Sequence, residues 1–156
     1  MAEELKALLE QRRIRVPLMV GIHTGGVWVA ERLHALLGLT HDLGILDISF
    51  YRDDFSRIGM NPQVKPSKLP YSVDDQHIVL VDDVLYTGRT VRAAMNEIFD
   101  YGRPASIVLA VLVDRGGREL PIEASVVGRH LALAAGQHVK LTGPDPLTLV
   151  IQDTKR

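Results

Sequence analysis

The chain has 156 residues, a formal net charge of −1 and no cysteine, and these figures exclude several classes of protein. We expect a single domain over residues 1–156, because this length suits one hydrophobic core. The lack of cysteine excludes disulfide frameworks, thiolate–zinc sites and a cysteine nucleophile. The charge gives no general basic field for nucleic acid. The longest apolar run, residues 107–113, is far too short to span a membrane, so we expect a cytoplasmic protein.

The first part of the chain predicts helices and strands in alternation. Residues 3–13 carry leucines at helical spacing, with acids first and bases last, as suits the helix dipole. An apolar run at 16–22 predicts a buried strand. Glycines follow it, and then an apolar-periodic helix over 27–37 ends at Gly38. Residues 45–50 alternate apolar and polar side chains, which is the period of a strand.

Residues 52–76 show no clear period and contain three prolines and a glycine. A loop of this length is uncommon in a compact domain and is usually functional or mobile. A hairpin inside the segment is the alternative, and it does not exclude mobility.

The second part of the chain continues the alternation. A buried strand over 78–81 is broken by two aspartates, a helix starts at about Thr90 and ends before Gly102, and 107–113 predicts another buried strand. Shorter strands are predicted at 124–128, 137–141 and 147–151, with a turn at 143–146 between the last two. This order predicts an α/β fold with a mostly parallel sheet flanked by helices.

Polar residues follow three of the predicted strands, at 23–26, 82–83 and 114–117. In an open α/β sheet ligands bind beyond the carboxyl ends of the strands. Asp82 and Asp83 precede the turn Thr87-Gly88-Arg89-Thr90, where free amides and the dipole of a helix start favour an anion. Acids that hold hydroxyls beside such a turn suit a sugar phosphate. The plainer interpretation is that Thr87 caps the helix and the acids face solvent.

Other classes of phosphate-binding protein match this sequence less well. The chain contains neither the G-x-x-x-x-G-K-[ST] motif of a P-loop nor the G-x-G-x-x-G motif of a dinucleotide site. A receiver-like phosphoacceptor domain also uses acids at strand ends. Its acid pair would come earlier in the chain, and nothing in it would explain the Thr-Gly-Arg-Thr turn.

Residues 79–90 (VLVDDVLYTGRT) resemble the 5-phosphoribosyl-1-diphosphate (PRPP) motif of type I phosphoribosyltransferases. More narrowly, the chain resembles the PyrR family, uracil phosphoribosyltransferases that in some bacteria also regulate pyrimidine-operon RNA. Further matches are YRDD, GRP, AVLVDRG and RELPI, at 51–54, 102–104, 110–116 and 118–122. The resemblance implies a central, mostly parallel twisted sheet flanked by helices, a mobile active-site loop at 52–76 and a small base-covering hood at about 115–130.

The resemblance also implies a role for each matching residue. Asp82 and Asp83 would hold the ribose hydroxyls, and Arg52 would open the mobile loop as the third catalytic residue. The other contacts fall into three groups: Thr87, Gly88, Arg89 and Thr90 for the 5′-phosphate; Thr24, Gly25 and Gly26 for pyrophosphate; and Asp114, Arg115, Val126 and Val127 for the base.

The implied reaction joins uracil to PRPP, giving UMP and pyrophosphate through an oxocarbenium-like transition state. The implied cofactor is Mg²⁺, bound through substrate oxygens, with Asp82 and Asp83 as its candidate protein ligands and no all-protein cage. Purine enzymes of the superfamily usually have Asp directly before the Thr-Gly pair. This chain has Tyr86 there, which agrees with a pyrimidine substrate.

Two positions depart from the family pattern. Gly25 stands where the pyrophosphate loop usually carries Arg, and Gly117 stands where the family usually has His. We expect Gly25 to weaken pyrophosphate binding unless Arg52, Lys65 or Lys68 compensates. A non-catalytic nucleotide sensor is therefore a further hypothesis.

The main alternative function is an RNA-binding attenuator of pyrimidine operons that senses UMP or UTP. Arg12, Arg13 and Arg15 could contact RNA, although a solvated helix end is the plainer interpretation. The chain starts about one helix later than family members usually do, so we expect RNA regulation to be disfavoured. The resemblance also implies a homo-oligomer, a dimer or tetramer.

Overall fold

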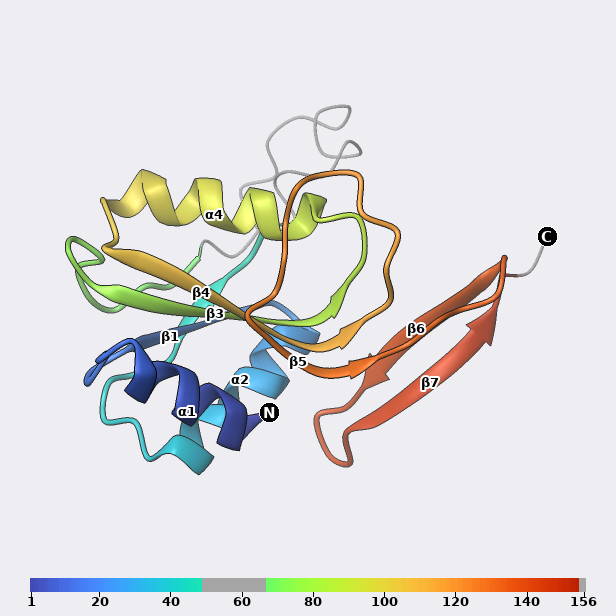
Figure 1. The fold of residues 1–156 in the computed structure, drawn as a ribbon, viewed down its shortest axis with the longest axis horizontal. Helices are drawn as coiled ribbons and strands as arrows, with labels where there is room; N and C mark the ends of the chain where they lie inside the picture. Colours follow the sequence, from blue (N-terminus) through green and yellow to red (C-terminus); the bar gives the residue numbers. More distant parts are fainter. Residues whose placement is uncertain (49–66, 155–156) are drawn as a thin grey trace.

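Five parallel strands form the central sheet of the protein, in the order β2-β1-β3-β4-β5 (Figure 1). The computed structural model describes residues 1–48 and 67–154. The strands are β1 (Leu18–Ile22), β2 (Gly44–Leu46), β3 (His77–Leu85), β4 (Ser106–Asp114) and β5 (Val126–His130). The predicted α/β fold with a parallel sheet is confirmed.

Helices cover both faces of this sheet. Helices α1 (Ala2–Gln11) and α2 (Gly25–Leu37) lie on one face, and α4 (Arg89–Tyr101) lies on the other (Figure 1). Both faces are apolar, because alternate side chains of a strand point to opposite sides. In β3, Val79 and Val81 pack with α1 and α2, whereas Ile78 and Leu80 pack with α4. No helix in the described residues is long and apolar enough to cross a membrane.

Strand β3 is longer than the sequence predicts. The two aspartates do not end it at residue 81, because its ladder with β4 continues through Asp82–Val111 and Val84–Val113 to Leu85–Asp114. The acids are therefore held inside a rigid strand rather than on a loop. Both helices that follow the site strands also start slightly earlier than predicted, α2 at Gly25 and α4 at Arg89.

An antiparallel ribbon of two strands follows the main sheet. Strands β6 (Gln137–Thr142) and β7 (Thr148–Asp153) form a separate sheet that extends from the body of the molecule (Figure 1). Leu141 anchors the ribbon, since its side chain is 5% exposed within the cluster that includes Val29 and Leu33 of α2. The two predicted strands and the turn between them are confirmed.

The predicted long loop is described only in part. Its residues 52–66 lie outside the described residues, so the loop and hairpin interpretations stay predictions there. Residues 67–76 contain an isolated bridge from Lys68 to Ile45 and otherwise no helix or strand.

We predict that Leu80→Ala lowers the free energy of unfolding by about 2–5 kcal/mol, because it leaves a cavity in the central strand. Leu80 is 0% exposed, whereas Leu36 on α2 is 72% exposed. Leu36→Ala is the matched control and should change the unfolding free energy by less than about 0.5 kcal/mol. Urea denaturation of both variants measures the difference, and equal effects would contradict the assigned core.

Candidate functional site

A cavity of about 620 Å³ opens at the carboxyl ends of β1 and β3. Residues from three separated segments line it: Thr24 and Gly25 at the start of α2, Asp82 and Asp83 in β3, and Thr90 in the first turn of α4. The structure thus brings together five residues that the sequence assigned to one site. The rest of the lining consists of Ile22, His23, Trp28, Asp47, Ile48, Val84, Lys140 and Leu141.

The two acids of β3 differ in their surroundings. Asp82 is 4% exposed, and burial, followed by the neighbouring charge of Asp83, raises the pKa of its carboxyl well above the usual range. Asp82 Oδ1 accepts the N–H of Asp83 at 2.8 Å, and Asp83 Oδ1 accepts the N–H of Val84 at 2.8 Å. Main-chain amides therefore hold both carboxyls in place. Asp83 is the more accessible of the two acids.

The start of α2 lies directly against β3. A Cβ atom on Gly26 would lie 2.7 Å from the carbonyl oxygen of Val81 and 3.1 Å from the Cα of Asp82. A Cβ atom on Gly25 would lie 2.7 Å from the carboxyl carbon of Asp83. Any side chain at position 25 therefore requires Asp83 to move.

The turn before α4 is held by its own hydrogen bonds. Gly88 has a left-handed φ of 94°, which glycine adopts without strain. Thr87 Oγ1 accepts the N–H of Arg89 at 3.1 Å. The guanidinium of Arg89 lies 3.6 Å from Glu119 in an exposed ion pair. Only Thr90 of this predicted phosphate turn lines the cavity, so the structure does not bring Arg89 into it.

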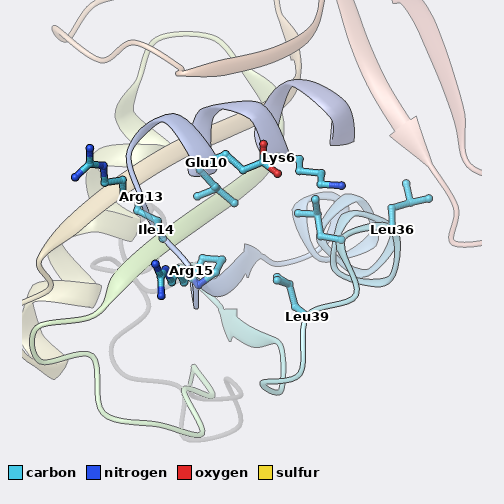
Figure 2. A pocket seen from close by; sticks show the side chains of 10 residues that line it. Lys6, Glu10, Arg13, Ile14, Arg15, Leu36 and Leu39 are labelled. Carbon is cyan, nitrogen blue, oxygen red and sulfur yellow. The ribbon is translucent and has the colours of Figure 1, made fainter.

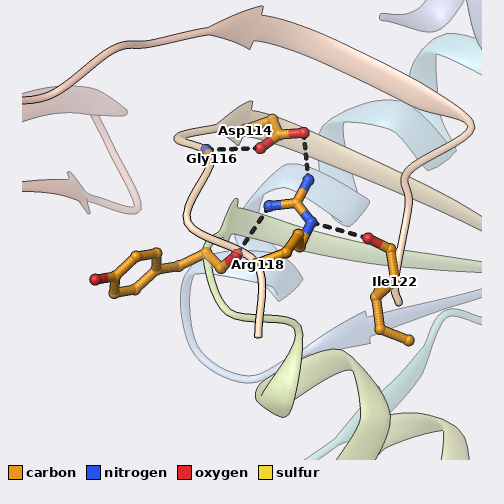
Figure 3. A network of polar contacts seen from close by, with 5 residues as sticks. Asp114, Gly116, Arg118 and Ile122 are labelled. Atoms are coloured by element: carbon orange, nitrogen blue, oxygen red, sulfur yellow. Dashed lines mark hydrogen bonds and ion pairs between the residues drawn. The ribbon is translucent and has the colours of Figure 1, made fainter. Parts of the chain in front are cut away.

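Arg118 joins three segments near the carboxyl end of β4, where the sequence predicted base contacts, and Figure 3 shows its hydrogen bonds. Its guanidinium donates to the carbonyls of Ile122 and Tyr86, both at 2.8 Å, and to Asp114 Oδ2 at 2.5 Å. Asp114 Oδ1 also accepts the N–H of Gly116 at 3.0 Å. Burial raises the pKa of Asp114, but these hydrogen bonds outweigh it, and the pKa is lowered. Both carboxylate oxygens are therefore engaged within the protein.

Sequence reasoning did not assign Arg118 a role, although the residue belongs to one of the matched segments. The available signal was an acid and a base four residues apart across a pair of glycines. That signal is weak, because two of the three partners of Arg118 are main-chain carbonyls, and one belongs to Tyr86, 32 residues away in sequence.

An arginine–tyrosine stack lies beside this network. The guanidinium carbon of Arg115 is 3.9 Å from the centre of the Tyr86 ring, a cation–π contact. Arg115 also donates to the carbonyl of Gln137 at 3.3 Å, but its buried Nε has no partner among the described residues. Gly117 has a φ of 81°, and a Cβ there would lie 2.5 Å from the Tyr86 ring. The ring thus occupies the space that a side chain at position 117 would need.

Val126 and Val127, which were predicted at the base, belong to β5 of the main sheet, paired with Ala110 and Val111. The Val126 side chain is 2% exposed in the core, so it cannot contact a ligand. A backbone contact from this strand stays a prediction.

The structure places only some of the positively charged residues near the site. Arg52 and Lys65 lie outside the described residues. Lys68 bridges to Ile45 through its main chain and does not line the cavity. Lys140 of β6 does line it, a contribution that sequence reasoning missed because only strand alternation marks this segment.

A second cavity, of about 650 Å³, lies between α1 and the end of α2 (Figure 2). Its floor is apolar, with Leu9, Ile14 and Leu39 among its residues, and Arg13 and Arg15 stand exposed at its edge. Its described lining contains neither a pair of adjacent acids nor a helix start.

We predict that Arg118→Met lowers the free energy of unfolding at pH 7 by about 1–2 kcal/mol, because two part-buried acceptors and one exposed acceptor lose a charged donor. The contact with Asp114 stabilises the fold fully above the unfolded pKa of 3.8 of this carboxyl. Its contribution is lost as the pH falls through the lowered pKa of the folded state. The difference from the wild type should therefore shrink below that pH. Arg89→Met, in the exposed pair, should change stability by less than about 0.5 kcal/mol. Urea denaturation at pH 7 and at a pH below the folded pKa of Asp114 measures this change. A difference in unfolding free energy that does not depend on pH would contradict the ionic contact.

Known proteins share both the sequence and the fold of this chain. Residues 2–138 match the family described as Phosphoribosyl transferase domain. A "Bifunctional protein PyrR" from Nitrosococcus oceani is 69% identical over 147 residues, which cover 93% of this chain and 82% of that protein. The protein of the same name from Pseudomonas entomophila is 60% identical over 153 residues, with coverages of 98% and 89%.

Solved structures show a similar fold. A hypoxanthine phosphoribosyltransferase from Staphylococcus aureus has a TM-score of 0.64 at 21% identity, and the match covers 83% of this chain and 70% of that one. The enzyme from Trypanosoma cruzi has a TM-score of 0.69 at 19% identity, covering 99% and 88%. With its parallel sheet and acid-lined cavity, the chain belongs to the phosphoribosyltransferase family and, within it, to the PyrR proteins.

Proposed function

We propose that this protein is a uracil phosphoribosyltransferase, which forms UMP and pyrophosphate from uracil and PRPP. The observation that carries the proposal is the cavity in which Asp82 and Asp83 meet two helix starts, those of α2 and α4. Acids accept hydrogen bonds from hydroxyls, and helix starts favour phosphates. A ribose with phosphate groups at both ends matches this arrangement.

Each part of the cavity has a distinct task. Asp83, the more accessible acid, accepts hydrogen bonds from the ribose hydroxyls. The buried Asp82 holds Asp83 in place, because Asp82 Oδ1 accepts the N–H of Asp83. The first turn of α4 binds the 5′-phosphate with the Thr90 hydroxyl and with the amides that follow Arg89, whose own N–H is bound by Thr87. The first turn of α2, at Gly25 and Gly26, binds the diphosphate.

The reaction needs little covalent chemistry from the protein. Uracil N1 attacks C1 of the ribose and gives up its proton, while the bond from C1 to the diphosphate oxygen breaks and pyrophosphate leaves. The sugar carries positive charge in the transition state. The Asp83 carboxylate stabilises that charge, and the amides of α2 stabilise the negative charge on the leaving group. The rigid strand and helix starts hold the reactants in line, which supplies much of the rate.

The carboxylates in the cavity are suitable ligands for a magnesium ion that is bound mainly by the substrate. Asp82 and Asp83 offer carboxylate oxygens, and within residues 1–48 and 67–154 no cluster of three or more His, Cys, Asp or Glu side chains is placed to hold a metal. Mg²⁺ keeps several waters and binds substrate phosphates through one or two carboxylates. When bound, it would neutralise charge on the pyrophosphate.

Tyr86 favours a pyrimidine as the base. Purine enzymes of this superfamily usually have an acid at this position, whereas Tyr86 presents a ring that is 47% exposed and stacked on Arg115. Parallel assays with uracil, orotate and hypoxanthine test the choice, each with PRPP and Mg²⁺ and with pyrophosphate release as the readout. Turnover with uracil alone is expected, and turnover with hypoxanthine would overturn the assignment.

A second function is favoured by the word "bifunctional" in the names of the relatives. We propose as the alternative that the protein binds the RNA of a pyrimidine operon and senses UMP or UTP in the same cavity. Titration of the leader transcript over a salt series tests this function, and affinity without sequence dependence would remove it. A homo-oligomer and a cytoplasmic location also stay predictions.

We predict that the double variant Asp82→Asn with Asp83→Asn lowers turnover by more than about 100-fold, because the ribose and the transition-state charge lose their acceptors. PRPP affinity should fall as well, while the thermal unfolding midpoint stays close to that of the wild type. The matched control replaces two exposed acids of the ribbon, Asp145→Asn with Asp153→Asn, and should retain full activity. Wild-type PRPP affinity in the double variant would refute the role in ribose binding.

We predict that Gly25→Ala lowers kcat/KM for PRPP by about tenfold or more, because the added methyl group displaces the Asp83 carboxyl. Stability should be retained, because alanine favours a helix. Gly38→Ala is the converse control. Gly38 has a φ of 62° with open space around it. Alanine there should lower the free energy of unfolding by about 1 kcal/mol and leave the activity unchanged. Steady-state kinetics and thermal unfolding of both variants distinguish these effects.

A further inference from the structure

Lys140 is the one lysine or arginine among the described residues that line the cavity. Its ammonium group forms no ion pair with any described residue. The same lining contains the acids Asp47, Asp82 and Asp83. Lys140 therefore brings positive charge to a cavity that is otherwise acidic.

The position of Lys140 is fixed by its strand. The next residue, Leu141, is 5% exposed in the hydrophobic cluster, and Lys140 pairs with Val150 across the ribbon. Close to the start of the turn, a Cβ atom on Gly143 would lie 3.0 Å from the ring of Trp28 on α2. These contacts hold β6 against α2, the helix whose start lines the cavity.

A diphosphate in this cavity needs a cation that the start of α2 does not supply. Thr24, Gly25 and Gly26 offer amides and a hydroxyl, but no charge. A charged side chain at position 25 would collide with Asp83. The adjacent acids repel an anion, so backbone amides act against an unfavourable local charge.

We propose that Lys140 is a binding residue for the diphosphate of PRPP and for pyrophosphate, and that it supplies the charge missing at Gly25. The proposal rests on the proposed function. Its chemistry is simple, because an ammonium group is a compact point charge with three donors on a flexible stem. Lys140 can therefore follow the diphosphate as the leaving group separates from the ribose.

The test measures the binding of pyrophosphate and of UMP separately, both with Mg²⁺, by titration calorimetry. Lys140→Met should weaken pyrophosphate binding about tenfold, because one charged hydrogen-bond donor is lost. UMP, which has no diphosphate, should bind within about twofold of the wild type. Lys140→Arg should restore most of the pyrophosphate affinity. Lys6→Met, an exposed lysine at the other cavity, is the matched control and should change neither affinity.

Kinetics give a second readout. Lys140→Met should raise KM for PRPP by a factor similar to the loss of pyrophosphate affinity, while KM for uracil stays unchanged. If the wild type binds both ligands but forms no UMP, the proposed function fails, and the binding data still test Lys140. Unchanged pyrophosphate affinity in Lys140→Met overturns the proposal, as does an equal loss for UMP. Lys140→Gln replaces the methionine variant if the latter does not fold.

Discussion

The contact between the first turn of α2 and strand β3 is the constraint on which the site depends. Gly26 packs against the carbonyl of Val81, and Gly25 packs against the carboxyl of Asp83. Helix α2 follows β1, the neighbour of β3 in the sheet. A helix start can approach an adjacent strand this closely only where side chains are missing at the point of contact. Because they are missing here, the start of α2 and the acids of β3, for which we propose diphosphate and ribose binding, lie at one small cavity.

Hydrogen bonds from one arginine join the segments around the turn before α4. Arg118 links the end of β4 at Asp114 with the segment after β3 at Tyr86 and with the loop at Ile122. The phosphate turn joins the same assembly, since Thr87 accepts the N–H groups of Glu119 and Leu120. One arginine thus connects the segment expected to face the base with the turn expected to bind the 5′-phosphate.

Much of this arrangement could be predicted from the sequence, because strands and helices of a parallel fold have clear periods and glycine turns between them. The acids of β3 were placed at the correct edge, but the strand was ended too early, since local pattern cannot show that β4 continues to pair with it. Gly25 and Gly117 depart from the family pattern, and Gly25 was expected to weaken pyrophosphate binding. The structure shows each as the partner of a side chain, Asp83 or Tyr86, that occupies the vacant space. Lys140 was missed because its neighbours in the cavity lie far away in sequence.

The ribbon has a consequence for how the cavity could be taken apart. The acids of β3 and both helix starts belong to the main sheet and its helices, whereas Lys140 and Leu141 of the cavity wall come from a separate two-stranded sheet. Removal of the ribbon would therefore keep the acids and both helix starts in the chain and take away one wall of the cavity.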